Sequence, residues 1–294
     1  MMPGMESLVR RLALVALALG CATQQPPPGA PSMPPPPAAP AAPPPETPAP
    51  PPPVVAPPPA EPQRLAWVNP SRCLSPCAFD PPDLVVIDAA GHPDPAGPHR
   101  VAREILPPLQ ELLAAAASAG HTLGINSAFR SYDDQAHLFA SIKQPGRAAL
   151  PGQSEHQLGT AVDLKLPSTG AADWLSAHAP DFGFVLSYPL GKHKVTGYRP
   201  EPWHVRFVGH PLAEEARGAG TLEELFRSKP DLGVSGTCGD CPAKARRKPC
   251  GAVTAAGACR GPLLSWCYEG ALATVDCSAF SQRCVAVDGG HDCQ

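Results

Sequence analysis

Two short segments in the middle of the chain alternate between apolar and polar side chains, which is the pattern of half-buried β-strands. Residues 160–166 place Asp163 on the face opposite three aliphatic side chains. Residues 203–208 alternate in the same way and place His204 opposite two aromatic side chains and a valine. We expect the two strands to lie side by side in one sheet, with Asp163 and His204 on the same face.

Apolar residues at helical spacing and capping signals predict helices around these strands. Residues 109–118 carry leucines and an alanine on one face of a helix. Ser131 is followed by Asp134, which is close to a capping box that opens a second helix. Thr221 and Glu224 form a capping box for a short last helix. Two apolar runs are predicted as short strands, a buried one over residues 83–88 and another over residues 122–127.

The N-terminal part of the chain differs from this globular pattern. Residues 1–21 have a basic end followed by an apolar run shorter than the roughly 20 residues that span a bilayer, and they predict an export signal. The run ends at Cys21 in a sequence that resembles a lipoprotein cleavage box, so we expect Cys21 to be lipidated, with plain secretion as the alternative. Residues 22–63 are a Pro/Ala-rich tether, because 21 of the 43 prolines fall between residues 26 and 62. Such a composition cannot bury a core and favours extended polyproline II.

The spacing of the cysteines predicts a disulfide-rich C-terminal domain. Of the 11 cysteines, ten remain when the lipidated one is set aside, and an even number suits disulfides in an oxidising compartment. Cys73 and Cys77 lie close enough in sequence to form a small-loop disulfide. The other eight lie between residues 238 and 293, in a segment too small for a good apolar core. We therefore expect four bridges within that segment.

The strongest chemical signal is a ten-residue stretch, SEHQLGTAVD, that ends at Asp163 and also contains His156. Further along the chain, the sequence EPWH supplies Glu201 and His204. Two histidines and one aspartate leave the fourth position of a tetrahedral zinc ion open for water, which is the arrangement of a catalytic rather than a structural site. Glu201 is then available as a general base. The sequence predicts a zinc hydrolase with His156, Asp163 and His204 as its metal ligands.

These motifs and their order resemble the VanY-type zinc D-alanyl-D-alanine carboxypeptidases, a family related to the metal-binding fold of hedgehog proteins. The resemblance extends from residue 68 to about residue 226. The motifs that carry it lie at residues 127–132, 151–163, 183–189, 196–198, 201–209 and 221–224. It implies an α+β fold in which helices flank an antiparallel sheet and the zinc lies in a cleft on that sheet.

The resemblance also implies roles for side chains around the metal. Glu201 corresponds to the catalytic base of the family. Arg130 corresponds to an arginine near the scissile carbonyl, where it would stabilise the oxyanion. Gln135 and Ser154 correspond to positions that contact the substrate.

Other residues near these motifs follow the family pattern less closely. Phe129 replaces a tyrosine, and Ser187 stands where relatives often carry arginine, so we expect both to bear on substrate preference. Tyr198 and Trp203 are predicted as core aromatics. Arg206 is expected either to hold a neighbouring carboxylate or to touch the substrate.

Together these features predict an exported zinc D,D-carboxypeptidase that removes the terminal D-Ala of peptidoglycan stem peptides. The enzyme domain is predicted at residues 64–232 and the cysteine-rich domain at residues 233–294, part of which resembles modules of secreted myxobacterial proteins. The lipid on Cys21 is expected to anchor the protein in the outer membrane, on the periplasmic side, unless the chain is secreted. A net charge of -3 gives no reason to expect nucleic acid as a partner. The alternatives are an L,D-carboxypeptidase or an endopeptidase of the same fold, or a non-catalytic zinc-bearing module that binds the cell wall.

Overall fold

The computed structural model describes residues 65–294 apart from residues 88–97, 143–145, 234–235, 239–240 and 242–247. The chain divides into two units, residues 1–55 and 56–294, and all described residues belong to the second. The predicted export signal, Cys21 and the proline-rich tether therefore lie outside the described residues. Within the described part, no helix is both long and apolar enough to cross a membrane.

A four-stranded antiparallel sheet packs against the main core of the described residues. Its strands run in the order β4 (Gly124–Ser127), β5 (Ala161–Lys165), β7 (His204–Phe207) and β6 (Phe184–Leu186). The predicted pairing of the two alternating segments is confirmed, since β5 and β7 are antiparallel neighbours with Asp163 directly opposite His204. The apolar side of β5, with Val162 and Leu164, is buried in the main core. The strand register therefore places Asp163 and His204 next to each other.

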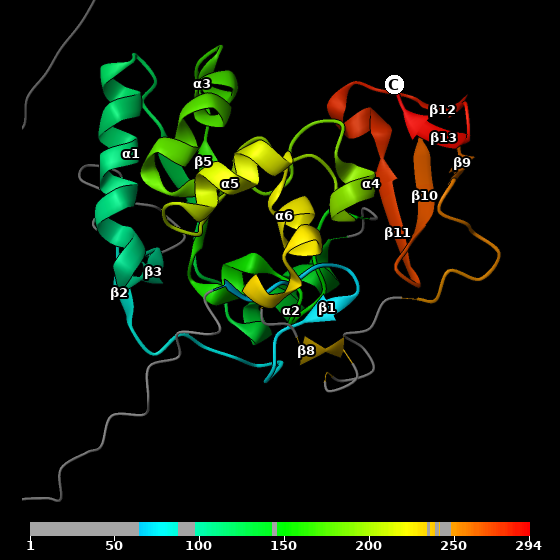
Figure 1. The fold of residues 1–294 in the computed structure, drawn as a ribbon, viewed down its shortest axis with the longest axis horizontal. Helices are drawn as coiled ribbons and strands as arrows, with labels where there is room; N and C mark the ends of the chain where they lie inside the picture. The colour runs from blue at the N-terminus through cyan, green and yellow to red at the C-terminus, as the bar shows by residue number, and fades with distance from the viewer. Residues whose placement is uncertain (1–64, 88–97, 143–145, 234–235, 239–240, 242–247) are drawn as a thin grey trace, which may run out of the picture. The chain divides into compact units, whose positions relative to one another are not determined.

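Helices flank this sheet, which confirms the predicted α+β class (Figure 1). Within the described residues they are α1 (Leu106–Ser118), α2 (Tyr132–Ser141), α3 (Ala171–His178), α4 (His193–Thr196), α5 (Leu212–Ala219) and α6 (Leu222–Ser228). Helix α1 begins before the predicted start because Pro107 and Pro108 suit its first turn. The predicted caps are confirmed, since the side chains of Ser131 and Thr221 accept hydrogen bonds from backbone N–H groups in the first turns of α2 and α6.

The strand predicted over residues 83–88 exists, but its predicted burial is wrong. Strand β2 (Leu84–Val86) pairs with β3 (Arg100–Ala102) in a two-stranded sheet. Val86 is 53% exposed, and Asp88 lies outside the described residues. A small antiparallel ladder packs one face against the core and leaves the other in contact with solvent. A continuous apolar run does not distinguish this arrangement from a strand buried on both faces.

The C-terminal part of the chain folds into small sheets around a core of its own. Strands β9 (Ala258–Arg260), β10 (Leu263–Tyr268) and β11 (Ala271–Asp276) form one sheet, and β12 (Cys284–Val287) pairs with β13 (Gly290–Cys293). Alternate side chains of β10, namely Leu264, Trp266 and Tyr268, are buried with Ala273 and Val275 of β11. Three disulfides within this part confirm the predicted disulfide-rich C-terminal region, while its boundary at residue 233 stays a prediction.

The predicted disulfide pairing is wrong in two respects. Cys73 pairs with Cys238 and Cys77 pairs with Cys241, so the small-loop bridge does not form. The C-terminal part then contains three internal bridges instead of four: Cys250–Cys267, Cys259–Cys284 and Cys277–Cys293. The cause is a long-range pairing of β1 (Arg72–Cys73) with β8 (Gly236–Thr237). This pairing brings the Cα atoms of Cys73 and Cys238 to 5.0 Å, within the range that a disulfide requires.

Candidate metal centre

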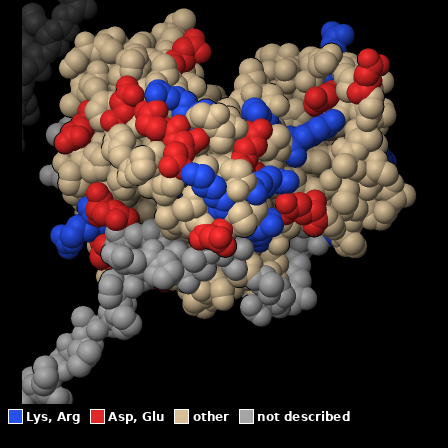
Figure 2. Space-filling view, viewed as in Figure 1, with Lys and Arg blue, Asp and Glu red and all other residues tan. Residues whose placement is uncertain are grey.

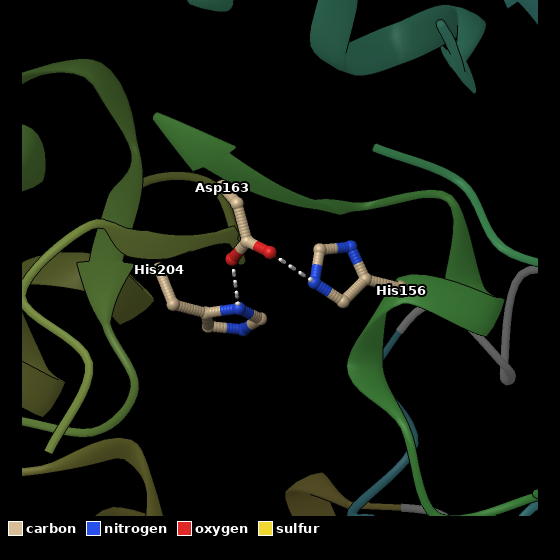
Figure 3. Close-up of side chains that lie close together, drawn as sticks. All are labelled: His156, Asp163 and His204. Carbon is tan, nitrogen blue, oxygen red and sulfur yellow. Dashed lines mark hydrogen bonds and ion pairs between the residues drawn. The ribbon is translucent and has the colours of Figure 1, made fainter. Parts of the chain in front are cut away.

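Three side chains from different elements meet in one polar cluster (Figure 3). His156 lies on a 3-10 helix (Glu155–Leu158), and Asp163 and His204 lie on β5 and β7. One candidate ligand atom of each side chain lies within 4.8 Å of the others. The carboxylate of Asp163 lies between the two rings: Oδ2 is 3.2 Å from Nε2 of His156, and Oδ1 is 2.9 Å from Nδ1 of His204. The structure thus brings together the three residues predicted as metal ligands.

The turn that carries His156 depends on Gly159. Its φ is +71°, in the left-handed region that favours glycine. A Cβ atom at this position would lie only 3.2 Å from the backbone nitrogen of Ala102 on β3. Glycine therefore lets the chain pass close to β3 between the 3-10 helix and the start of β5, which sets the distance between His156 and Asp163.

The outer ring nitrogens of both histidines are held by the protein. Nδ1 of His156 donates to the carbonyl oxygen of Ala128 at 2.7 Å. Nε2 of His204 donates to Oε2 of Glu155 at 2.9 Å. With these nitrogens engaged, Nε2 of His156 and Nδ1 of His204 are the atoms that face Asp163. Outer hydrogen bonds of this kind fix the orientation and tautomer of metal-binding imidazoles.

Glu155 is a residue of this site that the sequence did not indicate. Its buried carboxylate accepts hydrogen bonds from the hydroxyl of Ser187 at 2.6 Å and the guanidinium of Arg206 at 3.0 Å. Burial by itself would raise the pKa of Glu155, but Arg206 and His204 lower the pKa to about 2, so the carboxylate is ionised. The only local signal is its place beside His156 in the motif, because its contact with His204 depends on the fold.

The metal cluster opens into a cavity of about 280 Å³. Glu201, Arg130 and Ser154 line this cavity together with the cluster. Tyr198 and Trp203 also line it; the prediction of a core aromatic is confirmed for Tyr198, which is buried, whereas Trp203 is only partly buried. Further lining side chains include Asn126, Arg147, Tyr188 and Arg199. The candidate base, the candidate oxyanion partner and the metal ligands therefore face one cavity.

Gln135 and Ser187, both among the described residues, lie outside the cavity wall. Gln135 is fully buried: its Oε1 accepts from Arg130 at 2.6 Å and its Nε2 donates to the carbonyl oxygen of Ala149 at 2.7 Å. Both polar ends of Gln135 are thus bonded within the protein, next to Arg130, while its contact with a substrate stays a prediction. Ser187 lies behind the metal cluster, where it donates to Glu155 instead of shaping the pocket.

Glu201 has an arginine beside it in the cavity wall. Nε of Arg199 donates to Oε1 of Glu201 at 3.0 Å. The guanidinium of Arg199 lies 5.4 Å from the centre of the Trp203 ring. Burial raises the pKa of Glu201 above its ordinary value, although His204 and Arg199 oppose the rise. A carboxylate with a raised pKa accepts a proton more readily, which suits a general base.

We expect metal binding at this site to release a proton from His204 at neutral pH. Although burial lowers it, the hydrogen bonds to Asp163 and Glu155 raise the pKa of His204 to about 10 in the metal-free protein. A metal needs the Nδ1 lone pair, so the proton there must leave, and the apparent affinity should rise about tenfold per pH unit below that pKa. Titration calorimetry in buffers of different ionisation enthalpy measures the released proton. An affinity that stays flat with pH would contradict this expectation.

In a comparison with known protein families, residues 98–210 match the family model described as VanY: D-alanyl-D-alanine carboxypeptidase. A D-alanyl-D-alanine carboxypeptidase of Enterococcus faecalis (strain ATCC 700802 / V583) is 34% identical, over 44% of this chain and 57% of the relative. The bifunctional D-Ala-D-Ala dipeptidase and D-Ala-D-Ala carboxypeptidase VanXYC of Enterococcus gallinarum is 32% identical, over 49% of this chain and 84% of the relative. The solved structure of the LdcB LD-carboxypeptidase is 32% identical, with a TM-score of 0.49, over 56% of this chain and 86% of that one.

The length of the match differs between relatives. The chain spans 66% of the length of a Bacillus subtilis relative and smaller shares of two enterococcal ones, each less than two thirds. It spans most of the Enterococcus gallinarum protein, and the region matched by the family model contains the three clustered residues and Glu201. The chain therefore belongs to the VanY D-alanyl-D-alanine carboxypeptidase family.

Proposed function

We propose that this protein is a zinc-dependent D-alanyl-D-alanine carboxypeptidase that removes the terminal D-Ala of peptidoglycan stem peptides. The observation that carries the proposal is the cluster of His156, Asp163 and His204, which opens into a cavity that Glu201 and Arg130 also line. Family membership supports the choice of substrate, since two relatives are named for activity on D-Ala-D-Ala.

Zinc fits the donor atoms that the cluster presents. Two imidazoles and one carboxylate are a usual protein ligand set for a catalytic zinc site, with one position left for water or substrate. The carbonyl oxygen of Ala128 and the carboxylate of Glu155 hold the outer nitrogens of the two rings, as metal-binding histidines require. A bound zinc ion would supply Lewis-acid chemistry, polarising water and the scissile carbonyl group.

Residues of the chain supply the rest of the amide hydrolysis. Glu201 would accept a proton from the attacking water and return it to the leaving amine of D-Ala. Arg130, between β4 and α2, would stabilise the negative charge that develops on the carbonyl oxygen. Gln135 would keep Arg130 oriented by accepting its hydrogen bond, and Ser154 would contact the substrate from the cavity wall.

The same proposal includes a cellular setting outside the cytoplasm. The basic and apolar pattern of residues 1–21 supports export, and Cys21 supports a lipid anchor in the outer membrane. The tether at residues 22–63 would link the enzyme to that membrane. Membrane fractionation of the wild type and of Cys21→Ala tests the anchor, and an equal distribution of the two would favour plain secretion.

Product analysis tests the proposed activity directly. The zinc-loaded protein should release D-Ala from a stem pentapeptide, and mass spectrometry of the products identifies the bond that is cut. Cleavage of a tetrapeptide alone would indicate an L,D-carboxypeptidase, and cleavage within a cross-link would indicate an endopeptidase. Zinc binding without turnover of any stem peptide would favour a non-catalytic wall-binding module.

A further inference from the structure

We propose that the C-terminal cysteine-rich part positions the metal centre through the disulfides Cys73–Cys238 and Cys77–Cys241. Both disulfides pack against the segment that leads into His156. The C-terminal part would thus support catalysis, whether or not it also binds a ligand of its own. The activity readout of this inference rests on the proposed function, whereas its metal-affinity readout does not.

The segment that carries the metal motif is buried at every position from residue 150 to residue 164. A buried turn needs partners for its polar backbone groups. The backbone N–H of Leu74 donates to the carbonyl oxygen of Gly152 at 2.8 Å. Nε2 of Gln157 donates to the carbonyl oxygen of Cys77 at 2.8 Å. The backbone near Cys73 and Cys77 therefore forms hydrogen bonds with polar groups on both sides of His156.

The Cys77–Cys241 disulfide contacts this segment at Gly152. The φ of Gly152 is +81°, and a Cβ atom there would lie 2.5 Å from Sγ of Cys77 and 3.2 Å from Sγ of Cys241. Only glycine lets the disulfide approach the backbone so closely. The N–H of Gly152 in turn donates to Oε1 of Gln157 at 3.2 Å, one residue beyond His156. A displacement at the disulfide therefore reaches the metal ligand through one hydrogen bond and its neighbouring residue.

The Cys73–Cys238 disulfide contacts the next residue, Gln153. Nε2 of Gln153 lies 3.2 Å from Sγ of Cys238 and donates to the carbonyl oxygen of Pro70 at 3.1 Å. The carbonyl oxygen of Gln153 accepts a hydrogen bond from the hydroxyl of Tyr198 at 3.0 Å. Because Tyr198 lines the catalytic cavity, this disulfide is linked to the cavity wall as well as to the metal motif.

The rest of the C-terminal part also contacts the part of the described chain that precedes it. The hydroxyl of Tyr268 donates to the buried carboxylate of Glu223 at 2.6 Å. Gly146, which lines the cavity, packs so closely on β11 that a Cβ atom there would lie 1.8 Å from the carbonyl oxygen of Thr274. On the face shown in Figure 2, acidic and basic side chains of the described residues lie interspersed. The two disulfides are thus accompanied by other contacts between the C-terminal part and the rest of the described chain.

Removal of one disulfide from the full chain tests the proposal. The variant Cys77→Ala/Cys241→Ala keeps the Cys73–Cys238 bridge, and because the two bridges span 164 and 165 residues, most of the constraint on the chain remains. We expect its zinc affinity, measured by chelator competition, to fall about tenfold, with a similar fall in kcat/KM at saturating zinc. The matched control is Cys259→Ala/Cys284→Ala, which removes a bridge within the C-terminal part and should leave the zinc affinity unchanged.

Glycine substitutions give a second test that keeps every disulfide. Gly152→Ala places a methyl group against Sγ of Cys77 and should lower the zinc affinity. Gly191→Ala has similar backbone strain, at φ +77°, but no heavy atom lies within 4 Å of the new Cβ, so the affinity should not change. In the background of Cys77→Ala/Cys241→Ala the collision is relieved, and the further loss caused by Gly152→Ala should shrink.

Two results would overturn the proposal. One is a wild-type zinc affinity in the Cys77→Ala/Cys241→Ala variant, with folding verified by circular dichroism. The other is an equal loss from Gly152→Ala with and without the disulfide. A wild-type protein that binds zinc normally and turns over no stem peptide would count against the proposed function, while the affinity measurements would still decide this inference.

Discussion

Replacement of Glu201 by glutamine should lower kcat for D-Ala release by about 10²–10⁴-fold and leave the zinc content unchanged. Glutamine has nearly the same size but cannot accept a proton, so the loss falls on the step that deprotonates water. Glu201 is not one of the three clustered ligands, and zinc should still bind. The hydrogen bond from Arg199 can be kept by the amide oxygen, which preserves the cavity wall. Steady-state kinetics and metal analysis of the same sample measure both quantities.

The control for this variant is Glu111→Gln, because Glu111 is an exposed glutamate on α1. It undergoes the same chemical change outside the described cavity lining, and its kcat should equal that of the wild type. A Glu201→Gln enzyme with the wild-type kcat would show that another group takes the proton. In that case the assignment of Glu201 as the base would be wrong.

Replacement of Asp163 by asparagine should remove both zinc and activity. Asp163 contacts both imidazoles, at 3.2 Å from His156 and 2.9 Å from His204, and asparagine offers one oxygen and no negative charge. Loss of a direct ligand should cost more than the roughly 10–100-fold in affinity that outer hydrogen-bond partners contribute. Chelator competition measures the affinity, and D-Ala release should fall below detection at ordinary zinc concentrations.

The matched control is Asp173→Asn, an exposed position on α3, which should retain zinc and activity. The metal-free variant gives an independent readout, because Asp163 helps to raise the pKa of His204. The pKa of His204 should therefore be lower in Asp163→Asn, as an NMR titration of the imidazole would detect. Wild-type zinc affinity in Asp163→Asn would exclude this carboxylate from the ligand set.

The elements that carry the site are predictable from local patterns in the sequence. Alternation with a period of two reports which side chains share a face of a strand, and it places Asp163 and His204 correctly on neighbouring strands. Cap signals at Ser131 and Thr221 mark the starts of α2 and α6 because they satisfy backbone groups within one turn. These signals are reliable because the interactions that they report connect residues close together in the chain.

The contacts of a side chain are harder to predict from sequence than the helix or strand to which its residue belongs. The resemblance predicts that Gln135 contacts the substrate, whereas the structure shows a buried amide that bonds to Arg130 and Ala149 and lies outside the described cavity lining. Tyr198 is buried, as its prediction as a core aromatic requires, but it also lines the cavity, and its hydroxyl donates to the backbone carbonyl of Gln153. A residue type is compatible with either location, and the neighbouring elements determine which one the side chain occupies.

Long-range partners follow from tertiary packing. Glu155 reaches His204 across 49 residues, and Cys73 reaches Cys238 across 165 residues. Periodicity reports only how side chains point within one element, whereas these contacts depend on which distant elements pack together. Residue type and strand pairing are therefore enough to predict that Asp163 lies beside His204. The carboxylate behind His204 and the disulfides against the segment of His156 depend on the packing of elements that are far apart in the chain.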